Sequence, residues 1–236
     1  MEGSFRSGLI REVVELSCVG STNTYALDEG RAGLLVSAST QTAGRGRKGR
    51  PWFSPPDGNL YFTLTVQGSD PRLSLAAGVA LREALQGIVG QEPRVEIKWP
   101  NDLIVHAKKV CGILCESRGG ITAIGIGLNV NQRRFPPELE STAASLALVL
   151  GRDLCRRQVL GQVLASLQEW LPLFFRRGFE PVRRNFLKHG LLEGHRLLTE
   201  EGEPCSIVGL HEDGQLLISV AGTLRKIVSG SILIKG

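Results

Sequence analysis

The sequence has few of the features that mark exported, membrane-spanning or metal-binding proteins. It contains no run of 18 apolar residues and no signal-peptide arrangement of a charged start, an apolar stretch and a small-residue cleavage site. The five cysteines are an odd number at scattered spacings, with no CxxC pair and no neighbouring histidine cluster. We therefore expect a soluble, cytoplasmic protein without a membrane segment, whose cysteines are reduced and bind no zinc.

Positive charge is concentrated in one short segment and is not spread over the chain. The formal net charge is +5, and the segment 44–53, GRGRKGRPWF, supplies four cations, so the remainder of the chain carries +1. This distribution favours a discrete anionic ligand over a broad nucleic-acid surface. Four like charges within seven residues repel one another, and a bound anion would relieve that repulsion. A solvated loop without a ligand remains the alternative.

The same segment contains the pattern G-x-G-x-x-G at Gly44, Gly46 and Gly49. A dinucleotide-binding fold needs a helix that begins at the last glycine, and Pro51 and Pro55 exclude one. An arginine- and glycine-rich RNA-binding tract is a further alternative. Such tracts belong to disordered segments, whereas this one lies between two apolar, strand-like stretches. Anion binding is therefore the favoured interpretation.

Hydrophobic patterning predicts a mixture of helices and strands. The expected helices lie at 22–30, 71–88, after Asp153 and at 180–190, and Pro172 should kink or end the third of them. The expected strands are 34–38 and 59–66, followed by an antiparallel meander over 94–130. From residue 195 onward, short apolar runs alternate with glycine-containing turns, which indicates a small β-barrel. We expect two domains, 1–189 and 190–236.

Polar and charged residues gather where predicted strands end or begin. In KWPNDLIV, Lys98 ends a strand and Pro100 forces a turn, so Asn101 and Asp102 follow at the same edge. Asp102 can hold Mg²⁺, which prefers a few carboxylates together with phosphate oxygens. A turn whose side chains cap their own backbone explains this motif equally well. Lys109 precedes the apolar strand VCGILCES, where a lysine commonly only guards a sheet edge.

Two further motifs have the composition of a ligand site. GIGLNVN places two glycines and two asparagines at alternate positions of one predicted strand face: Gly125, Gly127, Asn129 and Asn131. Bare glycines admit a flat ligand, and amides can bind an adenine edge. A strand end weakened by glycine is the alternative. The triplet STN at 21–23 offers two hydroxyls and an amide, although a helix cap is the commoner explanation.

Taken together and in this order, these stretches resemble the motifs of bacterial biotin–protein ligases. The resemblance rests on STNTYA, TQTAGRGRKGRPWFSPPDGNLYFT, KWPNDL, KKVCGIL and IGIGLNVN, which cover residues 17–133 densely. It implies an α+β fold with a mixed sheet flanked by helices, as in the catalytic domain of class II aminoacyl-tRNA synthetases, and a small SH3-like β-barrel at the C-terminus. It also implies that biotin is activated with ATP to biotinyl-5′-AMP. The biotinyl group then passes to a lysine of a biotin carboxyl carrier protein, an acetyl-CoA carboxylase subunit.

The resemblance also implies roles for individual residues. Catalysis is assigned to Lys109, Arg45 and Arg47. The implied biotin site consists of Ser21, Thr22, Asn23, Gln41, Gly44, Arg45, Gly46, Arg47, Lys109, Gly112 and Gly125. The implied ATP and adenylate site consists of Arg47, Trp52, Lys98, Asn101, Asp102, Asn129 and Asn131, with Asp102 as the Mg²⁺ ligand. The basic segment then becomes a loop that closes over biotinyl-adenylate and shields it from water.

Some expectations concern partners and alternatives. Family members that act as repressors carry an N-terminal helix-turn-helix domain, and only 20 residues precede Ser21, so we expect no DNA binding and no repressor function. The resemblance is compatible with a homodimer. The alternative enzyme is a lipoate or octanoate ligase or transferase of related fold. A non-catalytic nucleic-acid-binding protein would suit the basic segment, but the +1 charge of the remaining chain argues against it.

Overall fold

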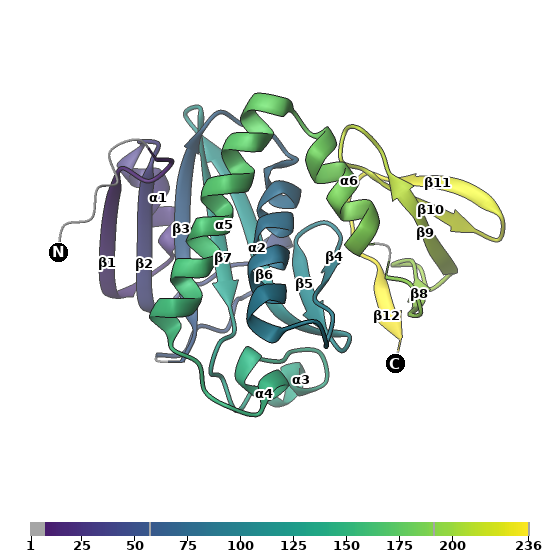
Figure 1. Cartoon of the computed structure of the whole chain (residues 1–236), viewed down its shortest axis with the longest axis horizontal. Coiled ribbons are helices and arrows are strands. Elements are labelled where there is room, and N and C mark those ends of the chain that lie inside the picture. The colour runs from purple at the N-terminus through teal and green to yellow at the C-terminus, as the bar shows by residue number, and fades with distance from the viewer. Residues whose placement is uncertain (1–7, 57, 191, 236) are drawn as a thin grey trace.

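A seven-stranded mixed sheet forms the centre of the computed structural model, which describes residues 8–56, 58–190 and 192–235 (Figure 1). The strand order is β1-β2-β3-β7-β6-β5-β4. β1 and β2 run parallel, whereas the other neighbours are antiparallel. The strands are β1 (Glu12–Val19), β2 (Leu34–Gln41), β3 (Leu60–Gln67), β4 (Glu96–Lys98), β5 (Asp102–Val105), β6 (Lys108–Arg118) and β7 (Ile121–Leu128). The expected meander and mixed sheet are confirmed.

Helices cover both faces of this sheet (Figure 1). α2 (Leu73–Val89) and α5 (Arg156–Arg177) pack against each other over one face. α1 (Thr22–Glu29) lies on the opposite face and contacts β2, β3 and β7. The remaining helical segments are η1 (Arg47–Gly49), α3 (Pro137–Glu140), α4 (Leu146–Leu150) and α6 (Glu180–His189). Among the described residues, no helix is both long and apolar enough to cross a bilayer.

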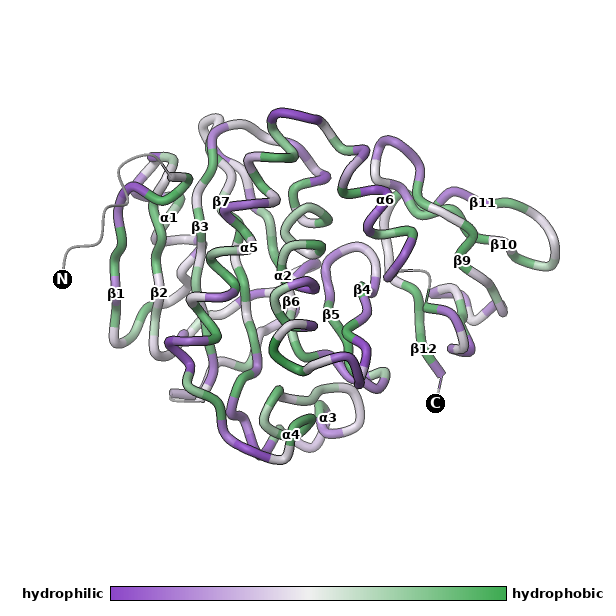
Figure 2. The backbone as a smooth tube through the Cα atoms, in the orientation of Figure 1, coloured by the Kyte–Doolittle hydropathy of each residue, from purple (hydrophilic) through white to green (hydrophobic). Residues whose placement is uncertain are grey.

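The two faces of β7 differ sharply in side-chain volume. Ile124, Ile126 and Leu128 join the core cluster that also contains the buried residues of α2. The intervening Gly125 and Gly127 face the side of α1, because successive residues of a strand alternate between faces. Figure 2 shows the apolar segments running through α2 and the central strands. The α1 face of β7 therefore carries little side-chain volume, and a cavity can form above it.

The C-terminal part forms a second sheet of five strands, in the order β11-β10-β9-β8-β12 (Figure 1). All of its neighbouring strands are antiparallel, and β12 returns to pair with β8. Its strands are β8 (Arg196–Leu198), β9 (Pro204–Leu210), β10 (Leu216–Val220), β11 (Thr223–Ile227) and β12 (Leu233–Lys235). The predicted series of short strands is confirmed, whereas closure as an SH3-like barrel stays a prediction.

The second sheet is joined to the first by apolar packing and a buried hydrogen bond. Leu197, Leu210 and Ile218 belong to the same core cluster as the residues of α2. Nε1 of Trp99, which follows β4, donates to the carbonyl oxygen of Gly214 at 2.9 Å. The apolar core therefore continues from one sheet into the other. The domain boundary near residue 190 stays a prediction.

Two local features differ from what the pattern predicts. β1 is not evident from the sequence, because its residues mix apolar and polar types. Within the described residues, only one of its edges is paired. α5 continues through Pro172 to Arg177, so an end of the helix at Pro172, one of the two expected outcomes, is wrong. Proline removes a single backbone N–H, and the buried side chains of Leu171 and Phe174 hold this turn against the core.

We expect Trp99→Phe to lower the free energy of unfolding by about 1–3 kcal/mol, because the buried carbonyl of Gly214 loses its donor. Denaturant unfolding followed by circular dichroism measures this change. Trp170→Phe is the matched control, since Nε1 of Trp170 donates to the exposed Glu83 and its loss leaves no buried group unpaired. An equal loss of stability in the two variants would contradict the special role of the contact between the sheets.

Candidate active site

A cavity of about 360 Å³ opens on the face of the sheet that carries α1. The N-terminal residues of α1, the end of β2, strands β5 to β7, the basic loop (residues 44–53) and the C-terminal sheet all contribute to its lining. Of the predicted site residues, only Gly44 and Asn131 lie outside the lining. The others all belong to it: Ser21, Thr22, Asn23, Gln41, Arg45, Gly46, Arg47, Trp52, Lys98, Asn101, Asp102, Lys109, Gly112, Gly125 and Asn129.

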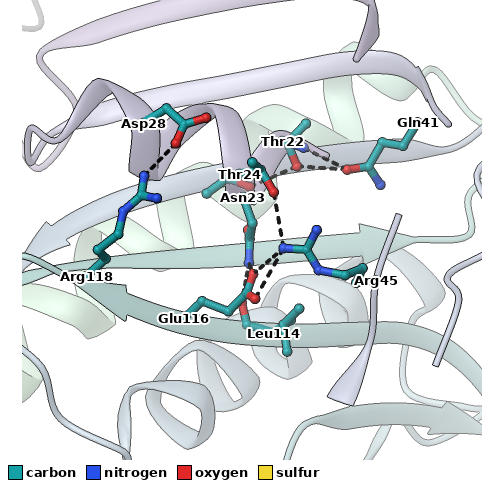
Figure 3. A network of polar contacts seen from close by, with 10 residues as sticks. Thr22, Asn23, Thr24, Asp28, Gln41, Arg45, Leu114, Glu116 and Arg118 are labelled. Carbon is teal, nitrogen blue, oxygen red and sulfur yellow. Dashed lines mark hydrogen bonds and ion pairs between the residues drawn. The ribbon is translucent and has the colours of Figure 1, made fainter. Parts of the chain in front are cut away.

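One end of the cavity, here called the neutral end, is built from Thr22, Asn23 and Gln41, which Figure 3 labels, together with Thr63. Oε1 of Gln41 accepts from the backbone N–H of Thr22 at 2.9 Å and from its hydroxyl at 3.1 Å. Gln41 thereby satisfies an N–H at the start of α1 that helix geometry leaves without a backbone partner. Ser21 occupies the N-cap position, but its side chain makes no capping bond. An ordinary helix cap therefore does not explain the STN triplet.

Asn23 is the centre of the neutral end (Figure 3). Its side chain is buried, and Nδ2 donates to the carbonyl of Leu114 at 3.1 Å and to Oε2 of Glu116 at 2.8 Å. Its Oδ1 accepts from the hydroxyl of Thr63 at 2.7 Å. Gly125 on β7 makes this approach possible, because a Cβ there would lie 2.1 Å from Oδ1 of Asn23. The amide is thus held in one orientation beside bare backbone.

The opposite end, here called the cationic end, is built from Lys98, Asp102 and Lys109. Nζ of Lys109 lies 2.7 Å from Oδ1 of Asp102, so these two side chains form an ion pair. Burial lowers the pKa of Lys98, Lys109 and Arg50 lower it further, and Asp102 partly opposes them. An anion bound beside Lys98 would favour its charged form. The cationic end is therefore suited to a carboxylate or a phosphate.

Trp52 of the basic loop lies between the two ends, against the glycines of β6 and β7. A Cβ on Gly127 would lie 2.3 Å from Cε2 of Trp52, and one on Gly112 would lie 2.8 Å from Cζ3. These two glycines are paired in register across the strands. Nζ of Lys109 lies 4.9 Å from the centroid of the Trp52 ring, a cation–π distance. Nε1 of Trp52 is buried and finds no hydrogen-bond partner among the described residues.

Arg45 and Arg47 contact different ends of the cavity. Nη2 of Arg45 lies 3.3 Å from Oε1 of Glu116 and 3.1 Å from Oγ1 of Thr24, beside the neutral end (Figure 3). Nη1 of Arg47 donates to Oδ1 of Asn101 at 3.4 Å, at the turn between β4 and β5 that carries the cationic end. The two arginines, which the resemblance groups together, therefore have different surroundings.

The C-terminal sheet also reaches the basic loop. Nη1 of Arg47 donates to the carbonyl of Gly230 at 3.2 Å, and Nζ of Lys48 lies 3.3 Å from Oε1 of Glu200. Arg45 and Lys48 are two of the four cations of this loop, and each of them faces a carboxylate. These carboxylates partly relieve the repulsion between the cations that the sequence predicts. A bound anion is therefore not required to relieve all of it.

Asn131 does not share a strand face with Gly125, so its predicted placement is wrong. β7 ends at Leu128, and the alternation of faces ends with it. Both polar atoms of the Asn131 side chain bond to the backbone of Leu154, each at 2.9 Å. This leaves no support for a contact between Asn131 and adenine. Asn129 does line the cavity, although its Nδ2 donates to the carbonyl of Ala144 at 3.0 Å.

Gly44, the other predicted residue outside the lining, lies at the base of the basic loop. A Cβ at this position would lie 2.8 Å from Oγ of Ser54 and 3.0 Å from Nε2 of Gln41. Its backbone carbonyl accepts from the N–H of Trp52 at 2.9 Å, which closes the basic loop at its base. Gly44 therefore fits a position where the loop passes close to β2, and its assignment to the biotin site stays a prediction.

Sequence reasoning missed four residues that build the site: Thr63, Glu116, Glu200 and Gly230. Two of them had a weak signal. Thr63 is a polar residue between the apolar residues Phe62 and Leu64 of a predicted strand, and Glu116 is an acid in the mainly apolar strand VCGILCES. Glu200 and Gly230 had none, because their contacts with the loop span more than 150 positions of sequence. Long-range pairings of this kind have no local pattern.

No group of three or more His, Cys, Asp or Glu side chains in the described ranges is placed to hold a metal ion. All five cysteines are free thiols. Burial raises the pKa of Cys115 to about 12, so this thiol remains protonated and unreactive at neutral pH.

Comparison with known proteins establishes the family. Residues 16–132 match the biotin/lipoate A/B protein ligase family. The chain is 31% identical over 239 residues to the bifunctional ligase/repressor BirA of Bacillus spizizenii, and this alignment covers 95% of this chain and 73% of that protein. It is 32% identical over 222 residues to the biotin–[acetyl-CoA-carboxylase] ligase of Paracoccus denitrificans, and this alignment covers 86% of this chain and 92% of that protein. The chain belongs to the biotin/lipoate A/B protein ligase family.

Solved structures agree with this assignment. The biotin protein ligase of Aquifex aeolicus, in complex with biotin and ATP, superposes with a TM-score of 0.83 at 34% identity, over 96% of this chain and 99% of that one. The biotin protein ligase of Leishmania major, in complex with biotinyl-5-AMP, superposes with a TM-score of 0.62 at 29% identity, over 92% and 99%. The mixed sheet flanked by helices is thus the fold of known ligases.

We expect Gly127→Ala to displace the Trp52 ring, because the added methyl group would overlap it and the backbone of Gly127 is fixed in β7. Tryptophan fluorescence should then shift to longer wavelength as the indole enters water, while far-ultraviolet circular dichroism stays unchanged. Gly161→Ala on α5 is the control, since a Cβ there meets nothing within 4 Å. Unchanged emission, or a shift that persists when Trp52 is replaced by Phe, would contradict the close approach.

Proposed function

We propose that the protein is an ATP-dependent biotin–protein ligase. The observation that carries the proposal is one cavity with two chemically different ends on a single sheet face. Hydroxyl and amide groups of Thr22, Asn23 and Gln41 suit a neutral, bidentate ureido ring. Lys98 and Lys109 suit a carboxylate and phosphates. Biotin and ATP together present these groups, and the names of the relatives above support this choice of substrates.

The first step joins two anions, and the cationic end neutralises them. The biotin carboxylate attacks the α-phosphorus of ATP, a carboxyl oxygen–phosphorus bond forms, and pyrophosphate leaves. Biotinyl-5′-AMP is the product. Lys98, Lys109 and Arg47 oppose the repulsion between the reactants and stabilise the charge that develops on the phosphoryl oxygens. Trp52 provides an apolar cover whose N–H has no partner among the described residues. Asn129 is the lining residue that we assign to adenine.

In the second step, a lysine amine of a carrier protein attacks the acyl carbon of the intermediate. The acyl–oxygen bond breaks, AMP leaves, and the amine loses its proton as the amide forms. The acceptor that we propose is a biotin carboxyl carrier protein of acetyl-CoA carboxylase, as the name of the Paracoccus relative suggests. The basic loop crosses the cavity and contacts both sheets, so it is placed to exclude water from the reactive mixed anhydride.

Mg²⁺ fits this site only together with the phosphates of ATP. Among the described residues that line the cavity, Asp102 and Glu200 are the acidic ones, and Glu200 is paired with Lys48. Mg²⁺ is usually held by one or two carboxylates plus substrate phosphate oxygens. Asp102 would supply the carboxylate, and the ion would neutralise phosphate charge. Lys109, which pairs with Asp102 here, would then be free to turn to the substrate.

We extend the proposal to the C-terminal sheet. Residues 190–236 would form a separate domain that closes as an SH3-like barrel. The short antiparallel strands and the return of β12 to β8 support this closure. The contacts of Glu200 and Gly230 with the basic loop give this domain a part in holding the loop over the substrates.

We expect biotin-dependent exchange of pyrophosphate into ATP and ATP-dependent biotinylation of one lysine of a carrier domain. Mass spectrometry of the carrier and a pyrophosphate-exchange assay measure the two steps separately. A carrier whose target lysine is replaced by arginine is the control for the second step. The same assays with lipoate in place of biotin test the alternative enzyme, a lipoate ligase of the same family. Exchange that depends on lipoate and not on biotin, or no exchange with either, would exclude the proposed reaction.

We expect ATP binding to take up protons at alkaline pH. In the free protein the pKa of Lys98 lies below its ordinary value of 10.5, and polyphosphate beside it favours the charged form and raises that pKa. Between the two pKa values the free lysine is neutral and the complexed lysine is protonated. Calorimetry in two buffers of different ionisation enthalpy measures this uptake. Lys98→Arg should abolish it, since arginine stays charged; equal uptake in that variant would contradict the assignment to Lys98.

A further inference from the structure

Glu116 on β6 is an acidic residue that touches the candidate site without lining it (Figure 3). Its side chain is 31% exposed, and it contacts two residues that do line the cavity, Asn23 and Arg45. These two come from α1 and from the basic loop, so one carboxylate joins both to the sheet. The motifs and the resemblance give Glu116 no role.

The first contact of Glu116 determines how the Asn23 amide is oriented. An ionised carboxylate and a backbone carbonyl are acceptors only, so Glu116 and the carbonyl of Leu114 both require the NH₂ group of Asn23. A flipped amide would place its oxygen against these two acceptors. The orientation seen here turns Oδ1 toward Thr63 and the bare backbone of Gly125. Glu116 therefore makes Asn23 present an acceptor to the neutral end of the cavity.

The second contact of Glu116 determines where the basic loop begins its path across the cavity. Nη2 of Arg45 lies 3.3 and 3.4 Å from the two oxygens of Glu116 and 3.1 Å from the hydroxyl of Thr24. These bonds draw the first arginine of the loop to the neutral end, away from Lys98 and Lys109. The positive charge of Arg45 is then compensated where a neutral group is to bind. Charge-assisted bonds of this kind are stronger than neutral ones.

We propose that Glu116 is a positioning residue for the ureido head group of biotin, and this inference rests on the proposed function. It acts through Asn23, whose acceptor it directs into the cavity, and through Arg45, which it holds at the neutral end. It does not contact the reacting carboxylate or phosphate. Loss of its charge should therefore weaken biotin binding and leave the chemical step almost unchanged.

Arg118 and Asp28 provide a matched control for this proposal. They join the same two elements, β6 and α1, with Nη2 of Arg118 at 2.6 Å from Oδ1 of Asp28 (Figure 3). Their side chains are 56% and 62% exposed, and neither lines the cavity. A variant of Arg118 therefore removes an ion pair between α1 and β6 without touching Asn23 or Arg45.

The experiment compares Glu116→Gln, Arg118→Gln and the unmutated chain. Titration calorimetry gives the Kd for biotin without ATP, and pyrophosphate exchange gives KM and kcat. We expect Glu116→Gln to raise the Kd and the KM for biotin about tenfold, as expected for one lost charge-assisted bond. Its kcat and its KM for ATP should stay within about twofold, and Arg118→Gln should match the unmutated chain.

A double-mutant cycle with Arg45→Gln tests the route of the effect. If Glu116 acts through Arg45, the rise in Kd of the double variant is smaller than the product of the single effects. Arg45 lies in an exposed loop, so its variant remains informative even where Glu116→Gln does not fold: an unchanged Kd in Arg45→Gln overturns the proposal. An unchanged or lowered Kd in folded Glu116→Gln overturns it too, as does an equal rise in Arg118→Gln.

These outcomes are separate from failure of the proposed function. An unmutated chain that neither binds biotin nor exchanges pyrophosphate in its presence would exclude the ligase itself. An unmutated chain that does both, combined with a Glu116→Gln variant of equal affinity, would exclude only the positioning role of Glu116.

Discussion

The bare backbone of β6 and β7 is the constraint on which the site depends. Gly125 admits the Asn23 amide, and Gly127 with Gly112 admits the Trp52 ring, at distances that no Cβ would allow. Glycine within a strand destabilises it by roughly 0.5–1 kcal/mol relative to alanine, and the isoleucines on the opposite face of β7 offset that loss through core packing. One strand thus serves the core with one face and the cavity with the other, so the position of the cavity follows from the packing of the sheet.

Charge compensation then divides the cavity into two kinds of environment. Arg45 and Lys48 of the basic loop are matched by Glu116 and Glu200, so the excess of positive charge that stands out in the sequence is partly cancelled in the folded chain. Lys98 differs, because burial and neighbouring cations lower its pKa and Asp102 only partly opposes them. Attraction for an anion is therefore strongest at the cationic end, and the neutral end is left to hydrogen bonding.

Most of the fold could be predicted from the sequence, because period-2 and period-3.6 apolar patterns correspond directly to the faces that strands and helices bury. The pattern fails at β1, an edge strand without a clean alternation, and at Asn131, where the strand has already ended. Fifteen of the site residues that the motifs predicted line one cavity. Thr63 and Glu116, which support the site, could not be predicted from the motifs. They act through side-chain contacts across strands, and a single sequence does not give the strand register on which these contacts depend.

Each contact that the basic loop makes with the rest of the protein is weak by itself. Exposed ion pairs contribute about 0–1 kcal/mol each, and Lys48 and Glu200 are of this kind. A free-energy difference of about 1.4 kcal/mol changes a population tenfold, so these contacts alone bias the loop toward closure only modestly. A bound anion that also engages Arg47 adds contacts that exist only in the closed arrangement. Under the proposed function, we therefore infer that the ligand governs closure and that the loop would hold most firmly when the charged intermediate is beneath it.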